Sequence, residues 1–111
     1  AKYIEFDAKE CQSKTSFPLS NIHLHQIKHM EKIIQHGGIA FLIISMNGDY
    51  YLFKGSDLIH FIHTNSRKSI PYSVIVELSV PLKVNYNIGL DYLKGIKEAY
   101  KGVGYFEDTK N

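Results

Sequence analysis

The chain has 111 residues, a length that suits one domain with a single modest core. Hydrophobic residues make up 44% and charged residues 22%, a balance that excludes wholesale disorder. The formal net charge of +2 is too small to identify a polyanionic partner by itself. The longest apolar run, Ile39 to Ile44, has the length of a strand, so no membrane-spanning helix is expected. The first residues lack the pattern of a signal peptide.

Cysteine and histidine give little support for a disulfide or a zinc site. Cys11 is the single cysteine, so no internal disulfide can form, which favours a reducing, cytoplasmic location. His25 and His29 lie four residues apart in a predicted helix and could form a ligand pair. They belong to no H-E-x-x-H motif, so we interpret them as surface groups.

The first predicted element is a strand over residues 4–9. Apolar and polar residues alternate there, which is typical of a half-buried strand. The alternation places Glu5, Asp7 and Lys9 on one face and the apolar side chains on the other. A polar loop is predicted from Cys11 to Ser20.

A helix is expected next, capped by Ser20 or Asn21 and ending near Gln35 before Gly37-Gly38. Its apolar positions recur every three or four residues, which is typical of a helix with one buried face. These positions are Ile22, Ile27, Met30, Ile33 and Ile34.

The middle of the chain predicts a hairpin and a second helix. The continuous apolar run from Ile39 to Ile44 suits a central strand that is covered on both faces. Asn47-Gly48 is a strong signal for a two-residue turn that leads into a second strand around residues 51–53. A helix follows from Asp57 to about His63.

The last part of the chain is less clear. Residues 71–78 fit either a short helix or a strand, and Pro81 is expected to break the chain. A final helix is predicted over residues 89–101, followed by a polar tail. The order of elements describes an α/β or α+β domain.

Chemistry is suggested by Asp7-Ala8-Lys9 on the polar face of the first strand. A carboxylate is a suitable ligand for Mg²⁺ or Mn²⁺. A lysine two residues away projects from the same face, where it can orient an attacking water or stabilise charge on a phosphate. The same tripeptide also fits a plain ion pair on an exposed strand edge, so the spacing alone does not decide.

The flanking residues carry a family resemblance. Four blocks follow in order: YIEFDAKE from Tyr3, KTSFPL from Lys14, HQIKHM from His25 and GGIAF from Gly37. Together they resemble the RecU family of Holliday junction resolvases, also called penicillin-binding-protein-related factor A. The resemblance covers roughly the first half of the chain and is looser in the remainder, around residues 67–70 and 90–93.

This resemblance implies a restriction-endonuclease-like fold of the PD-(D/E)xK class, with a mixed sheet flanked by helices. It implies a homodimer that cuts four-way DNA junctions with Mg²⁺ or Mn²⁺, in recombination and repair, and that acts with the strand-exchange recombinase. By motif position, Asp7 would bind metal, Lys9 would be the catalytic lysine, and Gln26 would lie near the attacking water or the scissile phosphate.

Two segments are candidates for DNA binding, the first implied by the resemblance and the second suggested by its charge. Lys14, Thr15 and Ser16 would lie beside the DNA backbone and offer one charge and two hydroxyls to phosphate. Arg67 and Lys68 form a basic loop that either contacts phosphate or is simply solvated charge.

The chain departs from the family in two ways. The family usually has glutamate in place of Asp7, and it carries an upstream helix, metal-binding aspartate and stalk. We therefore expect residues 1–102 to be the C-terminal portion of a nuclease domain, with its N-terminal part missing, and residues 103–111 to be a tail. A fragment, a separately supplied second piece and a degenerate homologue all fit this departure.

Three functions remain open from the sequence. The first is a structure-specific endonuclease for branched DNA. The second is a catalytically inactive homologue that binds junctions or regulates the recombinase. The third is a domain of the same fold that recognises ordinary duplex DNA.

Overall fold

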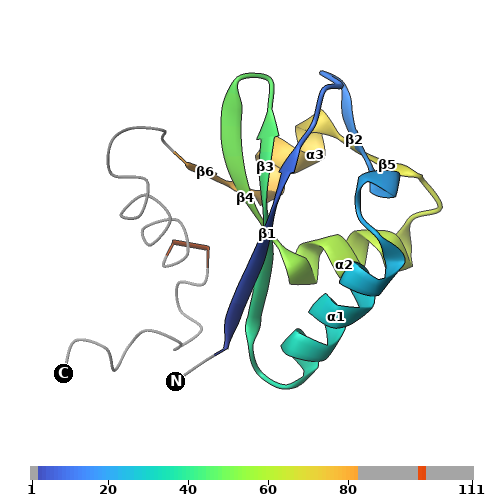
Figure 1. Ribbon diagram of the computed structural model, residues 1–111. Helices are drawn as coiled ribbons and strands as arrows, with labels where there is room; N and C mark the ends of the chain where they lie inside the picture. The colour runs from blue at the N-terminus through green and yellow to red at the C-terminus, as the bar shows by residue number, and fades with distance from the viewer. Residues whose placement is uncertain (1–2, 83–97, 100–111) are drawn as a thin grey trace.

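The computed structural model describes residues 3–82 and 98–99, in which helices pack against one face of a mixed sheet (Figure 1). The sheet has the strand order β1-β3-β4-β6. Its first two strands are parallel, and the other two pairs are antiparallel. The strands are β1 (Ile4–Glu10), β3 (Ile39–Met46), β4 (Asp49–Lys54) and β6 (Val80–Leu82). A mixed sheet flanked by helices is thereby confirmed.

Strand β3 forms the centre of the core, as its continuous apolar run predicts. Residues 39–44 are all buried, because the strand has a neighbour on each side and is covered on both faces. Ala40, Leu42 and Ile44 belong to the core beneath the helices. Ile39, Phe41 and Ile43 belong to a smaller cluster on the opposite face, against which Val80 and Ala99 pack.

Helix α1 (Leu24–Gln35) begins later than the sequence predicts. Ser20 and Asn21 do not cap it, because they lie in a short 3-10 helix, η1 (Leu19–Asn21). His23 is the capping residue, and its backbone N–H donates to the side chain of Gln26. The predicted end near Gln35 is confirmed: Gly37 has a positive φ of 83°, the left-handed conformation that follows many helices.

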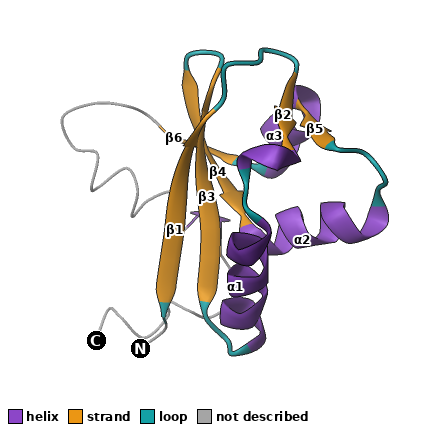
Figure 2. Ribbon diagram, turned by 45° about the vertical axis from the view of Figure 1, so that its right-hand side comes forward, coloured by secondary structure: helices purple, strands orange, loops and turns teal. Residues whose placement is uncertain are grey.

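The predicted hairpin and second helix are also confirmed. Asn47 and Gly48 both have positive φ, 54° and 80°, as a two-residue turn between β3 and β4 requires. Helix α2 (Gly55–Thr64) follows directly after β4. Its Leu58 and Phe61 are buried in the same core as residues of α1. Figure 2 shows α1 and α2 on the same side of the sheet.

A small two-stranded ribbon was not predicted. Within the polar loop, β2 (Ser16–Pro18) pairs in antiparallel fashion with β5 (Ser69–Pro71). Residues after Pro71 form helix α3 (Tyr72–Leu78), which decides between the two predicted alternatives. The predicted interruption of secondary structure at Pro81 is wrong. Pro81 lies within β6 at the edge of the described sheet, where proline is tolerated.

Two predictions lie mostly outside the described residues. Of the predicted helix over residues 89–101, only Glu98 and Ala99 are described, and both are helical. The boundary between residues 102 and 103 is not covered. In the described parts of the chain, no helix has the length and apolar character needed to cross a membrane.

Candidate functional site

The polar face of β1 is turned toward the helices. Asp7 pairs with Leu42 across the parallel strands, so its side chain shares the face that carries α1. Glu5, Asp7 and Lys9 are all half-buried there. The apolar face is the more exposed one: Phe6 is 47% exposed, although its ring stacks on Phe41 with centroids 5.3 Å apart.

Three residues that the resemblance singles out meet at one point of this face. Lys9 Nζ lies 3.0 Å from Asp7 Oδ2. Gln26, from the first turn of α1, donates from Nε2 to the same carboxylate oxygen at 2.9 Å. Lys9 Nζ also donates to Gln26 Oε1 at 3.3 Å. The structure therefore brings Asp7, Lys9 and Gln26 into a closed triangle of hydrogen bonds. We call it the catalytic triangle after the role that the resemblance predicts for these residues.

The amide of Gln26 has a defined orientation in this triangle. Its Oε1 accepts from two donors, the backbone N–H of His23 at 3.1 Å and Lys9 Nζ. Its Nε2 is consequently the atom that faces Asp7. The side chain of Lys9 is only 18% exposed, whereas that of Asp7 is 45% exposed. Solvent can thus reach the carboxylate of Asp7, whereas the ammonium group of Lys9 is mostly covered and is held by Asp7 and Gln26.

A second contact joins β1 to α1, between Glu5, two residues before Asp7, and His29, three residues after Gln26. His29 Nε2 lies 2.9 Å from Glu5 Oε2, and the hydroxyl of Tyr3 donates to Glu5 Oε1. The hydrogen bond from Tyr3, followed by that from His29, lowers the pKa of Glu5 from its usual value. The same contact raises the pKa of Tyr3. Sequence reasoning did not identify Tyr3, although its even spacing from Glu5 along the strand places both on one face.

A cavity of about 310 Å³ lies beside the catalytic triangle, between β1, α1 and β3. Its polar lining includes the side chains of Glu5, Asp7, Gln26 and His29. Within residues 3–82 and 98–99, no three metal-ligating side chains of His, Cys, Asp or Glu gather at one point. The cavity therefore offers a divalent cation two carboxylates, of which Asp7 is more exposed (45%) than Glu5 (38%), and it fits such an ion only in part.

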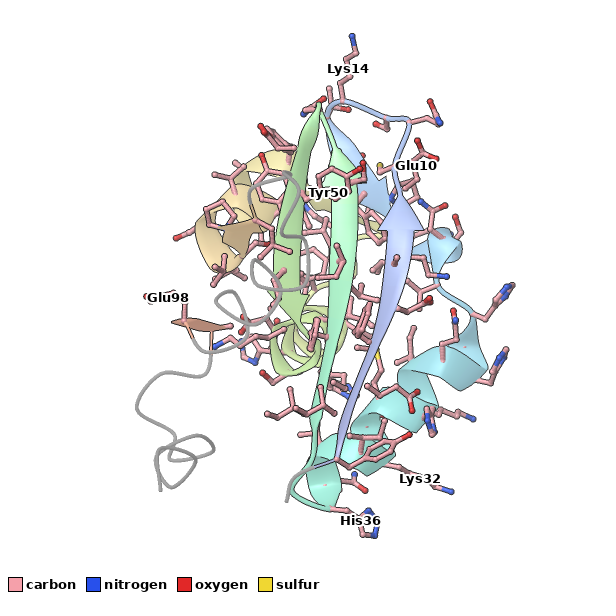
Figure 3. The ribbon with its side chains drawn as sticks, turned by 60° about the vertical axis from the view of Figure 1, so that its left-hand side comes forward. Glu10, Lys14, Lys32, His36, Tyr50 and Glu98 are labelled. Carbon is pink, nitrogen blue, oxygen red and sulfur yellow. The ribbon has the colours of Figure 1, made fainter. Side chains whose placement is uncertain are left out.

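The first predicted DNA-binding segment forms a compact turn after β1. Lys14 and Thr15 are exposed, and Ser16 is half-buried as the first residue of β2. Ser13 Oγ accepts from the backbone N–H groups of Thr15 and Ser16 at 3.3 and 3.4 Å. Asn47 Nδ2 donates to the backbone carbonyl of Lys14 at 3.0 Å. Figure 3 shows that Lys14 lies at the outer tip of this turn.

The second predicted DNA-binding segment leads into the other strand of the ribbon, β5. Arg67 and Lys68 are exposed immediately before β5, and the carbonyl of Lys68 accepts from Leu19 N at 2.9 Å. Ser16 pairs with Pro71, so the two segments lie at opposite ends of the β2–β5 ribbon. None of the side-chain contacts of the described residues joins either segment to the catalytic triangle.

Comparison with known proteins gives a consistent result. A family model described as "RecU: Recombination protein U" matches residues 1–98. Proteins named "Holliday junction resolvase RecU" from Bacillus thuringiensis (strain Al Hakam), Bacillus cereus (strain AH820) and Bacillus anthracis (strain A0248) are each 44% identical to this chain over 104 residues. The alignment covers 89% of this chain and 52% of each relative. The chain thus spans about half the length of the curated relatives it matches.

Proposed function

Because the chain belongs to the recombination protein U family, we propose that it forms part of an endonuclease that cuts four-way DNA junctions during recombination and repair. The reaction is hydrolysis of a phosphodiester bond. The observation that carries this proposal is the catalytic triangle, in which one carboxylate, one ammonium group and one amide converge beside a cavity.

Asp7 is the proposed ligand of a divalent cation, Mg²⁺ or Mn²⁺. Its carboxylate is a hard oxygen ligand and is 45% exposed, so an ion could reach it without unfolding the site. When bound, such an ion neutralises charge on the phosphate that is attacked. One carboxylate does not complete a magnesium site, so further ligands would come from water, from the DNA phosphate or from protein groups beyond those described.

Lys9 is proposed to act on the phosphate or on the attacking water. Its ammonium group carries three donors, and contacts with Asp7 and Gln26 use two of them. A phosphoryl oxygen placed beside Asp7 would accept the third. Since charge builds on the phosphate in the transition state, a preorganised cation stabilises that state more than the ground state.

Gln26 is proposed to hold this arrangement and to contact the water or phosphate. Its amide is held by the N-terminus of α1 through His23, so the position of the helix controls the position of the catalytic groups. Phosphates away from the cut bond are proposed to contact the exposed residues Lys14, Thr15, Arg67 and Lys68 and the half-buried Ser16.

The symmetry of a four-way junction favours two identical active sites. We therefore propose a homodimer as the cutting unit, with the strand-exchange recombinase as a further partner. A reducing cytoplasm suits the single cysteine, Cys11, which is buried and donates its thiol to the carbonyls of Ser13 and Ser16.

The test is cutting of a labelled four-way junction by the intact protein that carries this chain, with Mg²⁺, with Mn²⁺ and with a chelator. Lys9→Met should lower the rate by about 10²–10³-fold. Asp7→Asn should abolish cutting while junction binding persists. Asp49→Asn is the matched control. Asp49 is an exposed carboxylate at the start of β4, outside the catalytic triangle, so this variant should cut at the parental rate. Cutting at the parental rate by Lys9→Met would disprove the site, and junction binding without product in any metal would select an inactive homologue.

A further inference from the structure

A second cavity continues the first along the interface of β1 and α1. Its volume is about 470 Å³, and it shares His29 and Ile33 with the cavity beside the catalytic triangle. The second cavity is lined also by Tyr3, Lys32 and His36, and we call it the basic cavity. The two cavities follow one another from the beginning of α1 to its end.

The charges of the two cavities differ. The first cavity contains two carboxylates, Glu5 and Asp7. None of the residues that line the basic cavity is acidic, and Lys32 stands there between two histidines. In the described part of the chain, no carboxylate lies within ion-pair distance of Lys32 or His36. Glu31, the acidic residue of α1, is directed instead to His63 of α2.

The carbonyl groups at the end of α1 accept hydrogen bonds within the protein, which lowers their repulsion of an anion. An unsatisfied helix C-terminus would repel phosphate. Here Gly38 N donates to Ile33 O at 2.8 Å and Gly37 N to Ile34 O at 3.0 Å. In addition, His36 Nδ1 donates to Lys32 O at 2.8 Å, so the other ring nitrogen, Nε2, can donate to a phosphate when the ring carries both protons.

We propose that the basic cavity binds the phosphodiester backbone of the DNA strand whose scissile phosphate lies at Asp7. This inference rests on the proposed function and adds a binding site to it. Six residues separate Gln26 from Lys32, which corresponds to about 9 Å along the helix axis. Phosphates of one strand follow each other every 3.4 Å or so along a duplex axis. With the duplex axis parallel to α1, Lys32 meets a phosphate about three nucleotides from the cut bond.

The position of Lys32 also distinguishes this site from the segments proposed above. Figure 3 shows Lys14 at one end of the molecule and both Lys32 and His36 at the other end. A strand that passes the catalytic triangle would therefore be held on both sides of the cut.

The experiment measures binding of a labelled four-way junction to the intact protein in chelator, between about 50 and about 200 mM salt. Lys32→Gln should weaken binding roughly fivefold to tenfold at ~0.1 M salt and reduce the salt slope by about 0.9 for each protomer of the proposed homodimer. Lys32→Arg should bind as the parent does. Lys28→Gln is the matched control, because Lys28 is an exposed lysine of the same helix that lines neither cavity. Equal salt slopes for Lys32→Gln and the parent, or equal losses for Lys28→Gln and Lys32→Gln, would overturn the proposal.

A second measurement covers the case in which Lys32 only supports the helix end. Side-chain NMR signals of Lys32 and His36 are followed while a short single-stranded oligonucleotide, or inorganic phosphate, is added to the parental protein. The oligonucleotide should shift both signals at a far lower phosphate concentration than inorganic phosphate does. Equal potency of the two, or no shift, contradicts a DNA-strand site. Junction cutting by the parent is measured in parallel, so that loss of the proposed function is recognised separately.

Discussion

Gln26 Nε2 donates a 2.9 Å hydrogen bond to Asp7 Oδ2 and so joins the first turn of α1 to the edge strand β1. The same side chain closes the helix N-terminus, because its Oε1 accepts from the backbone of His23. One residue thus links the folding of the helix to the geometry of the catalytic triangle.

Two substitutions of Gln26 should separate these roles. Gln26→Ala loses both and should destabilise the protein by about 1 kcal/mol, measured by urea unfolding. Gln26→Glu keeps an acceptor for His23 N but loses the donor to Asp7, so we expect only part of the stability to be retained. It places a second carboxylate against Asp7 and should slow junction cutting roughly a hundredfold. If Gln26→Glu cuts like the parent, the amide has no part in the chemistry.

Asp7→Glu should retain cutting, whereas Asp7→Asn should not. The resemblance implies glutamate as the usual residue at this position, and the 45% exposure of Asp7 leaves space for one more methylene group. The charge needed to bind a cation is kept in Asp7→Glu and lost in Asp7→Asn. Rates measured over a range of Mg²⁺ concentrations check this, and equal loss in both variants would show that side-chain length, rather than charge, is decisive.

Much of this fold could be predicted because local patterns agree with the final packing. The run from Ile39 to Ile44 became the central strand, and Asn47-Gly48 became the hairpin turn. The β2–β5 ribbon escaped prediction because each strand has three residues, and its pairing joins segments about fifty residues apart. Nothing local in such short segments specifies a partner.

The candidate site was predictable in part for the same reason. Strand alternation placed Asp7 and Lys9 on one face, and the structure confirms this. The alternation could not tell which face the helices would cover, since that depends on the parallel register with β3. The later start of α1 was missed because Gln26 supplies the cap from inside the helix, in place of Ser20 or Asn21.

Removing the hydroxyl of Tyr3 should raise the pKa of Glu5. The hydrogen bond from Tyr3 is the largest cause of the lowered pKa of Glu5, ahead of the contact with His29. A lowered folded-state pKa contributes stability above the unfolded value, about 4.3, and this contribution is lost as pH falls through the folded-state pKa. NMR titration of Glu5 in Tyr3→Phe checks the direction. An unchanged pKa in this variant would mean that His29 alone holds the carboxylate.

The hydroxyls of Tyr51, which is buried, and Tyr72, which is half-buried, should make the protein sensitive to alkali. The two hydroxyls share a hydrogen bond across the interface of β4 and α3, and this bond raises the pKa of Tyr51 to about 12. Because the folded-state pKa lies above the unfolded value of 10.0, the contribution is complete below pH 10 or so and is lost as pH rises toward about 12. Tyr51→Phe should therefore lose less stability than the parent between about pH 10 and about pH 12, measured by urea unfolding. Tyr50→Phe, which removes a hydroxyl from the exposed neighbour, should behave like the parent, and an equal loss in all three proteins would contradict the assignment.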